Sequence, residues 1–314
     1  MFREFFCAAW PTSLWAWGGF VVVVGYAFFL ASVKAQLNQF YERFYDLLQK
    51  GGDVDPPSGE YDDTYAAYRE QVASELQSFV FIVLPLVSAT PACKWARSAW
   101  AFLWRMSLMQ SYLEQWDTQR EPIEGASQRL HEDTQRFASG LEGCLIVVLD
   151  AGFTLCVFTP ILLDLSKAIA PPFEMGQLDD VWLWGMAFTC SLVGLMGAAI
   201  LGQKLVGLEV ANQRVEALLR KDLVLLETTP AVIVGQTIEQ QQYAPWRFFE
   251  ETLRRLYRNY HALFRHFSML NTWLSFYDQV MTLLPYFVAA PLLFAADPER
   301  RITLGTLIQM SNSF

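Results

Sequence analysis

Charged residues are scarce in this chain. Asp, Glu, Lys and Arg make up 18% of its 314 residues, against 53% for hydrophobic residues. A soluble globular domain carries about 25% charged residues, so the composition excludes an ordinary soluble fold. The formal net charge is −9, which provides no basic surface for phosphate groups. Nucleic acid is therefore excluded as a partner.

The residue patterns of metal sites and of common enzymes are also missing. The five cysteines form no Cys-x-x-Cys pair, and two of the three histidines, His261 and His266, stand five residues apart, which is a poor spacing for metal ligands on a helix. No Gly-x-x-x-x-Gly-Lys-Ser/Thr loop, Gly-x-Ser-x-Gly or His-Glu-x-x-His motif occurs. We expect no metal, no cofactor, no enzymatic activity and no nucleotide-binding loop within these residues.

Long apolar runs are what the chain does have. Crossing a bilayer takes about 20 apolar residues. Runs of this kind occur at about 13–35, 77–104, 143–169, 181–205 and 270–296, and another begins near 302. The sequence therefore predicts an all-α, polytopic membrane protein in which residues 1–314 form a single transmembrane domain. Because the last run stops at Phe314, we expect the sequence to be truncated within its sixth helix.

Two long polar segments separate the runs, at about 105–142 and 205–265, and both are typical of helices. Basic residues orient them, because segments 94–136 and 204–265 hold six and nine of the 23 Lys and Arg residues. The linkers 51–77 and 170–180 hold one and none. Positive charge collects on the cytoplasmic side of a membrane. We expect both segments, and the N-terminus with Arg3, to face the cytoplasm.

Glutamates lie next to the apolar runs and form the first candidate site. Glu142 adjoins the run that begins at Gly143, and Glu132 lies ten residues before it. Spacings of seven and eleven residues keep a second set on one helical stripe. This second set consists of Glu209, Glu216 and Glu227.

Two interpretations of these glutamates stay open. Carboxylates facing a water-filled cavity would load and release protons and attract cationic cargo. Alternatively they form salt bridges on helix surfaces, since Glu132 with Arg136 and Glu216 with Arg220 are pairs four residues apart.

Asp150 is a separate candidate, because it lies about two turns inside the third run. An ionisable group at such a depth indicates a functional site. The alternative is a protonated aspartate that is hydrogen-bonded to a neighbouring helix.

Aromatic residues gather after the first run and along the second. The two groups are Phe40, Tyr41, Phe44 and Tyr45, and Trp95, Trp100 and Trp104. Aromatic side chains commonly form a belt at the membrane interface. The sharper interpretation is a set of stacking surfaces for a peptide in a cavity.

Two polar stretches resemble the SbmA/BacA family of peptide transporters. They are residues 123–142 (IEGASQRLHEDTQRFASGLE) and 207–222 (GLEVANQRVEALLRKD), and weaker similarity extends over 1–6, 38–48 and 302–312. The resemblance implies a homodimer in the bacterial inner membrane, with an ABC-exporter-like membrane fold, long cytoplasmic helical extensions and no ATPase domain. It also implies uptake of antimicrobial peptides and peptide antibiotics, driven by the proton gradient.

Functional positions of that family fall on particular residues of this chain. The glutamates fall on Glu132, Glu142, Glu216 and Glu227, and a tyrosine beside the cavity falls on Tyr45. The sequence departs from the family pattern at Asp150, where members carry Asn, and in the loop after Glu227.

Three functions are therefore weighed. The first is a proton-coupled peptide importer, and the second is the membrane half of an ABC exporter whose ATPase domain lies beyond Phe314. The third is a membrane receptor or assembly protein that transports nothing.

Overall fold

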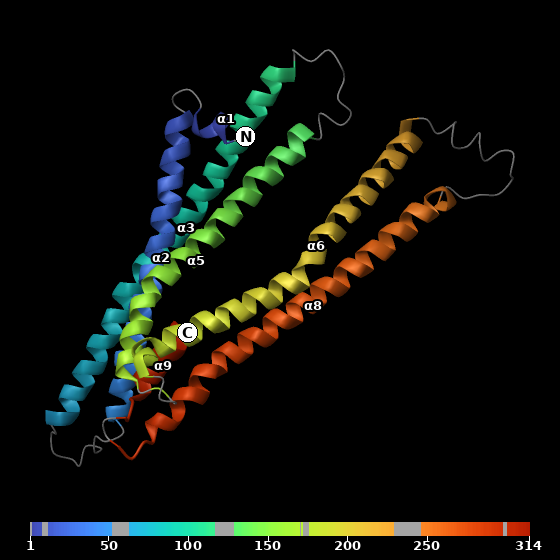
Figure 1. Cartoon of the computed structure of the whole chain (residues 1–314). Coiled ribbons are helices and arrows are strands. Elements are labelled where there is room, and N and C mark those ends of the chain that lie inside the picture. The colour runs from blue at the N-terminus through green and yellow to red at the C-terminus, as the bar shows by residue number, and fades with distance from the viewer. Residues whose placement is uncertain are drawn as a thin grey trace. The chain divides into compact units, whose positions relative to one another are not determined.

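The computed structural model describes residues 2–7, 12–51, 63–116, 129–169, 171, 176–228, 246–297 and 300–314. Every element in these ranges is a helix, and none of them contains a strand. The prediction of an all-α protein is confirmed. The helices (Figure 1) are α1 (Arg3–Phe6), α2 (Thr12–Gly51), α3 (Asp63–Trp116), the π-helix η1 (Arg129–Asp133), α5 (Thr134–Ala168), the 3-10 helix η2 (Gly176–Val181), α6 (Trp182–Thr228), α8 (Trp246–Leu293) and α9 (Leu304–Ser313).

The long helices join apolar runs to polar extensions without a break. In α3 the helix continues through Pro85 and Pro91, and in α5 and α6 the apolar part and the polar part form one helix of 35 and 47 residues. A proline inside a helix removes one backbone hydrogen bond but is tolerated in membrane helices. The sequence boundaries therefore mark changes of polarity along continuous helices.

Four helices are long and apolar enough to cross a membrane. They are the helical stretches Thr12–Gly51, Tyr65–Glu114, Leu130–Ala168 and Asp179–Val224, and they contain the first four predicted runs. The fifth predicted run lies in α8, which is not among these four and carries Asp278 within the run. A fifth crossing stays a prediction.

The chain divides into two compact units. Unit 1 comprises Met1–Trp184 and Pro285–Phe314, and unit 2 comprises Gly185–Leu284. In unit 1, α2, α3 and α5 pack against one another around a core that α1 closes. This core consists of Phe5, Ala16, Val23, Trp100, Trp104, Leu108 and Ala138.

Tryptophans of α3 hold this core together. The ring of Phe5 stacks on that of Trp104 with centroids 5.1 Å apart, and Trp100 donates a hydrogen bond to the Ala16 carbonyl at 2.9 Å. A side chain at Gly19 would collide with the Trp100 ring, since its Cβ would lie 1.9 Å from that ring. Because both tryptophans are buried, they form neither an interfacial belt nor a stacking surface for cargo; Trp95 is exposed.

Helix α9 packs on α2. Asp46 and Gln49 of α2 accept hydrogen bonds from the Gly305 and Leu304 amides at 2.8 and 2.9 Å, which satisfies amides that a helix start leaves free. A Cβ at Gly305 would lie 2.1 Å from the Glu42 carbonyl oxygen, so only glycine fits there. The start of the predicted sixth run is thus a docked helix of unit 1.

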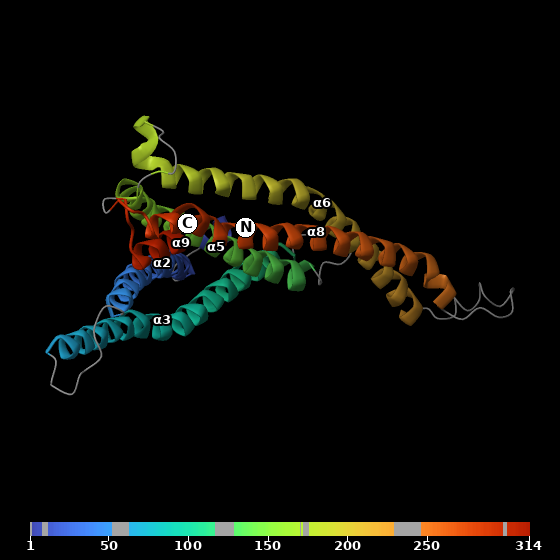
Figure 2. The same ribbon diagram turned by 90° about the horizontal axis from the view of Figure 1, so that it is seen from below.

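Unit 2 is built from α6 and α8, which run side by side (Figures 1 and 2). Aromatic rings of α8 fill the spaces beside glycines of α6. A Cβ would lie 2.4 Å from Tyr277 at Gly194 and 2.3 Å from Trp273 at Gly197. Tyr277 also donates a hydrogen bond to the Cys190 carbonyl at 2.5 Å. Glycine on one helix therefore allows the close approach of the other.

Candidate functional site

The acidic candidate residues fall in both units. Glu132, Glu142 and Asp150 belong to unit 1, on η1 and α5, whereas the remaining three belong to α6 in unit 2. That second set is Glu209, Glu216 and Glu227.

Glu142 is paired with an arginine of another helix. Arg97 Nε of α3 lies 3.4 Å from Glu142 Oε1, and the side chains are only 23% and 18% exposed. The distance is that of an ion pair, but no described acceptor is aligned with the buried Arg97 N–H as a hydrogen bond requires. We regard the contact as an ion pair because opposite charges attract without strict alignment. It joins α3 to α5 at the start of the apolar part of α5.

Glu132 forms the salt bridge that one interpretation predicts. Arg136 Nη2 lies 3.6 Å from its carboxylate, four residues along the chain. Arg105 of α3 donates a hydrogen bond to the His131 carbonyl at 3.3 Å, which holds η1 against α3. An exposed pair of this kind contributes about 0–1 kcal/mol. The first part of the family-like stretch, residues 123–128, lies outside the described residues.

Asp150 has a partner that sequence reasoning missed. Lys34 Nζ of α2 donates to both carboxylate oxygens, at 2.8 and 3.1 Å. The predicted first run ends at residue 35, one residue after Lys34, whereas α2 continues to Gly51. A lone lysine within a long apolar helix was the signal available in the sequence.

Glu216 accepts a hydrogen bond from the Tyr260 hydroxyl of α8. The pKa of Tyr260 is raised, first because the neutral hydroxyl donates to this carboxylate, while a hydrogen bond with Asn212 acts in the opposite direction. Asn212 is buried on the same face of α6 as Glu216, one turn before it. Neither Tyr260 nor Asn212 was a candidate from the sequence.

The other two glutamates of α6 are exposed. Glu209 accepts a hydrogen bond from Gln213 at 3.3 Å, on the same helix. Glu227 lies near the end of α6, and the following residues 229–245 are outside the described part of the chain. The predicted stripe thus lies on one continuous helix.

Tyr45 is half-buried on α2 among other rings. Its centroid lies 6.1 Å from Phe44 and 6.4 Å from Tyr41, and Phe44 stacks on Phe40. Its role beside a cavity stays a prediction.

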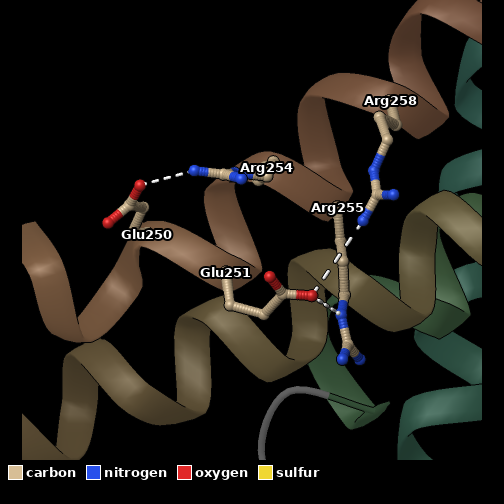
Figure 3. A network of polar contacts seen from close by, with 5 residues as sticks. All are labelled: Glu250, Glu251, Arg254, Arg255 and Arg258. Carbon is tan, nitrogen blue, oxygen red and sulfur yellow. Dashed lines mark hydrogen bonds and ion pairs between the residues drawn. The ribbon is translucent and has the colours of Figure 1, made fainter.

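Two adjacent glutamates near the start of α8 are followed, one turn later, by arginines (Figure 3). Arg254 contacts Glu250 at 2.6 Å, and Arg255 contacts Glu251 at 2.9 Å. The hydrogen bond from Arg255 lowers the pKa of Glu251. These exposed pairs lie within one helix and illustrate the salt-bridge alternative in its plain form.

Within the described ranges, no three His, Cys, Asp or Glu side chains gather as a metal site. The site is instead a series of separate carboxylates on η1, α5 and α6, most of which contact a neighbouring polar or basic side chain. A carboxylate of this kind can bind a proton, a basic side chain of the protein or an external cation, and one of these can replace another.

The chain is similar to proteins that are named as parts of ABC transporters. An uncharacterized ABC transporter ATP-binding protein, sll0182 of Synechocystis sp., is 23% identical over 249 residues, which cover 75% of this chain and 34% of that protein. The inner membrane ABC transporter ATP-binding protein YddA of Escherichia coli is 24% identical over 225 residues, which cover 67% and 38%. The chain spans about a third of the length of these relatives.

The family match covers nearly the whole chain. The SbmA/BacA-like family matches residues 9–314, and the helices described above supply the apolar spans that a membrane transporter needs. The predicted resemblance is confirmed: this multi-pass membrane protein belongs to the SbmA/BacA-like family of transporters.

Proposed function

We propose that the protein imports peptides across the bacterial inner membrane as a homodimer, driven by the proton gradient. Its N-terminus and the polar parts of its long helices would face the cytoplasm. Carboxylates on α5 and α6 would carry the protons and bind cationic groups of the cargo. The proposal requires no cofactor.

The ion pair of Glu142 with Arg97 is the observation that carries this proposal. The two side chains are mostly buried and come from different helices. Protonation of Glu142 removes its charge and leaves Arg97 without a counter-ion, which is costly for a buried group. Proton loading would therefore weaken the contact between α3 and α5, and proton release would restore it. This links the proton gradient to a movement of helices.

Cationic cargo fits the same chemistry. A peptide guanidinium or ammonium can pair with a carboxylate when the protein's own cation withdraws. Glu216 adds a carboxylate in unit 2 whose partner, Tyr260, is neutral. A proton or a cation could bind there without displacing a charged side chain.

Uptake by the complete gene product in proteoliposomes tests the proposal. A pH gradient is imposed without ATP, and a labelled cationic peptide is followed. We expect uptake that a protonophore abolishes, and that Glu142→Gln or Glu216→Gln removes while insertion stays intact. The exposed Glu114→Gln, on α3, is the matched control and should transport normally. Unchanged uptake in both glutamate variants would refute the proposal.

A second function has an observation of its own. Both relatives are named as ABC transporter ATP-binding proteins, and this chain matches only about a third of each. The chain would then be the membrane half of an ABC exporter whose ATPase domain lies outside these residues. Uptake or export that requires ATP, together with a phosphate-binding loop in the complete gene, would favour this alternative.

A further inference from the structure

The ion pair between Lys34 and Asp150 lies at an unusual place for two charges. Lys34 is flanked on α2 by the buried, apolar Val33 and Ala35. Asp150 lies in the apolar part of α5, after Leu149. Ionisable groups are costly in such a setting and mark functional positions.

The exposure of the pair indicates that it faces water. The Lys34 and Asp150 side chains are 40% and 37% exposed. Charged groups in apolar helices avoid hydrocarbon and turn toward the protein interior or a water-filled cavity. We take the exposed side of the pair to face such a cavity, where a solute can reach it.

The geometry is that of a bound organic cation. One ammonium group donates to both oxygens of the carboxylate, at 2.8 and 3.1 Å. A guanidinium can make the same two contacts as a planar fork, and a free ammonium can make them as Lys34 does. Lys34 thus holds a position that the cationic group of a peptide would also fit.

Thr154, one turn after Asp150, has a buried hydroxyl, and no described residue pairs with Thr154 Oγ1. Because Thr154 lies four residues after Asp150 on α5, it follows on the same helix face. Asn38 Oδ1 of α2 also lacks a donor among the described residues, but the Asn38 amide donates to Gln309 and Ser313 of α9 and so belongs to the contact between α2 and α9.

A buried oxygen without a hydrogen-bond partner costs free energy. An incoming cation with several N–H groups can relieve that cost at Thr154 Oγ1.

We propose that Asp150, with Thr154 one turn after it, binds a cationic group of the peptide cargo, and that Lys34 occupies this position until cargo displaces it. The cation is a guanidinium or a primary ammonium. This inference rests on the proposed import of peptides and names the substrate group and the residue that competes with it. Lys34 makes entry selective, since only a cation can replace a cation at the carboxylate.

Binding to the purified full-length protein tests the proposal without a proton gradient. The probes are a short fluorescein-labelled peptide containing arginine and the same peptide with citrulline, which keeps the shape but lacks the charge. A lysine and norleucine pair of peptides separates ammonium from guanidinium binding. Fluorescence anisotropy gives the dissociation constants.

Removal of the competitor should strengthen binding of cations alone. For Lys34→Met we expect the dissociation constant of the arginine peptide to fall about two- to fivefold, with no change for the citrulline peptide. Lys34→Arg should behave as wild type. Asp150→Asn should weaken arginine binding, and adding Lys34→Met to it should then have no effect. Thr154→Val should weaken arginine binding less than Asp150→Asn.

Two outcomes would overturn the proposal. One is equal binding of the arginine peptide by folded Lys34→Met and wild type, and the other is an equal change for both peptides. If Lys34→Met fails to fold, two other variants still decide. Discrimination between the arginine and citrulline peptides must fall in the neutral double variant and in Asp150→Asn, because both remove the Asp150 charge. Charge discrimination without proton-driven uptake would refute the proposed function alone, whereas proton-driven uptake with no effect of these variants would refute this site alone.

Discussion

The two units hold their interhelical candidate carboxylates, Glu142 and Asp150 in unit 1 and Glu216 in unit 2, by different means. In unit 1, Glu142 and Asp150 are paired with Arg97 and Lys34, basic side chains that come from other helices. In unit 2, Glu216 is held by the neutral hydroxyl of Tyr260 on α8. A proton added in unit 1 breaks an ion pair between helices, whereas a proton added to Glu216 rearranges one hydrogen bond. Coupling of protons to helix movement is therefore expected mainly in unit 1.

The packing of the units differs in the same way. Unit 1 has a buried core of tryptophans and apolar side chains around Trp104. Unit 2 consists of two long helices that approach each other where glycines of α6 meet aromatic rings of α8. Small changes at those glycines should therefore affect unit 2 strongly.

The largest expected effect comes from Arg97→Met. It leaves Glu142 mostly buried without its counter-ion, which should cost about 1–3 kcal/mol of stability and abolish uptake. Thermal melting of the purified protein and uptake in proteoliposomes measure both. The double variant Arg97→Met with Glu142→Gln should regain the stability but not the transport. Arg136→Met breaks the pair with Glu132, in which the arginine is exposed, and should change stability and uptake only slightly. If it lowered stability and uptake as much as Arg97→Met, the two ion pairs would not differ in importance as proposed.

The next effect concerns the contact between α6 and α8. Gly197→Ala adds a methyl group against the Trp273 ring and should destabilise the protein by about 1–3 kcal/mol. Gly207→Ala, on the same helix, meets no atom within 4 Å and should stabilise it by about 0.5–1 kcal/mol. Melting temperatures test the pair of variants. Equal shifts would show that close packing at Gly197 contributes nothing.

A smaller effect is expected at Tyr260. Because the hydrogen bond to Glu216 raises the pKa of this tyrosine, its contribution to stability is fully present below the ordinary tyrosine value of about 10 and is lost as pH rises through the raised value. Stability of wild type should thus fall more steeply above about pH 10 than stability of Tyr260→Phe. Tyr257→Phe, on the same helix, is the control. Parallel pH profiles for all three proteins would argue against the contact.

The smallest effect is expected from Glu251→Gln. Arg255 lowers the pKa of Glu251, so the pair contributes stability above the ordinary glutamate value of about 4.3, and that contribution disappears as pH falls through the lowered value. Because the carboxylate is exposed, the change in melting temperature should be small and uptake should be unaffected. A transport defect in this variant would give the exposed ion pairs of α8 a role that their position does not suggest.

Much of the fold could be predicted from the sequence, because apolar runs and basic segments follow directly from the membrane as a solvent. The runs lie within long helices, and residues 123–142 and 207–222 pointed to the correct family. The residues that hold the carboxylates could not be predicted. Lys34 and Asp150 are 116 residues apart, and Tyr260 and Glu216 are 44 apart, so only helix packing brings them together. Both interpretations of Trp100 and Trp104, as an interfacial belt and as a stacking surface for cargo, were wrong, since both residues are buried. The spacing of tryptophans along a helix is the same whether they pack between helices or lie at the membrane interface.

Proton-driven uptake is the central claim, and one measurement tests it most directly. The complete gene product is reconstituted in liposomes with a pH gradient and no ATP, and uptake of a labelled cationic peptide is compared between wild type and Glu142→Gln. We predict uptake by wild type that collapses with a protonophore, and none by Glu142→Gln. Wild-type uptake that needs ATP or persists without the gradient would contradict the account, and so would undiminished uptake by Glu142→Gln.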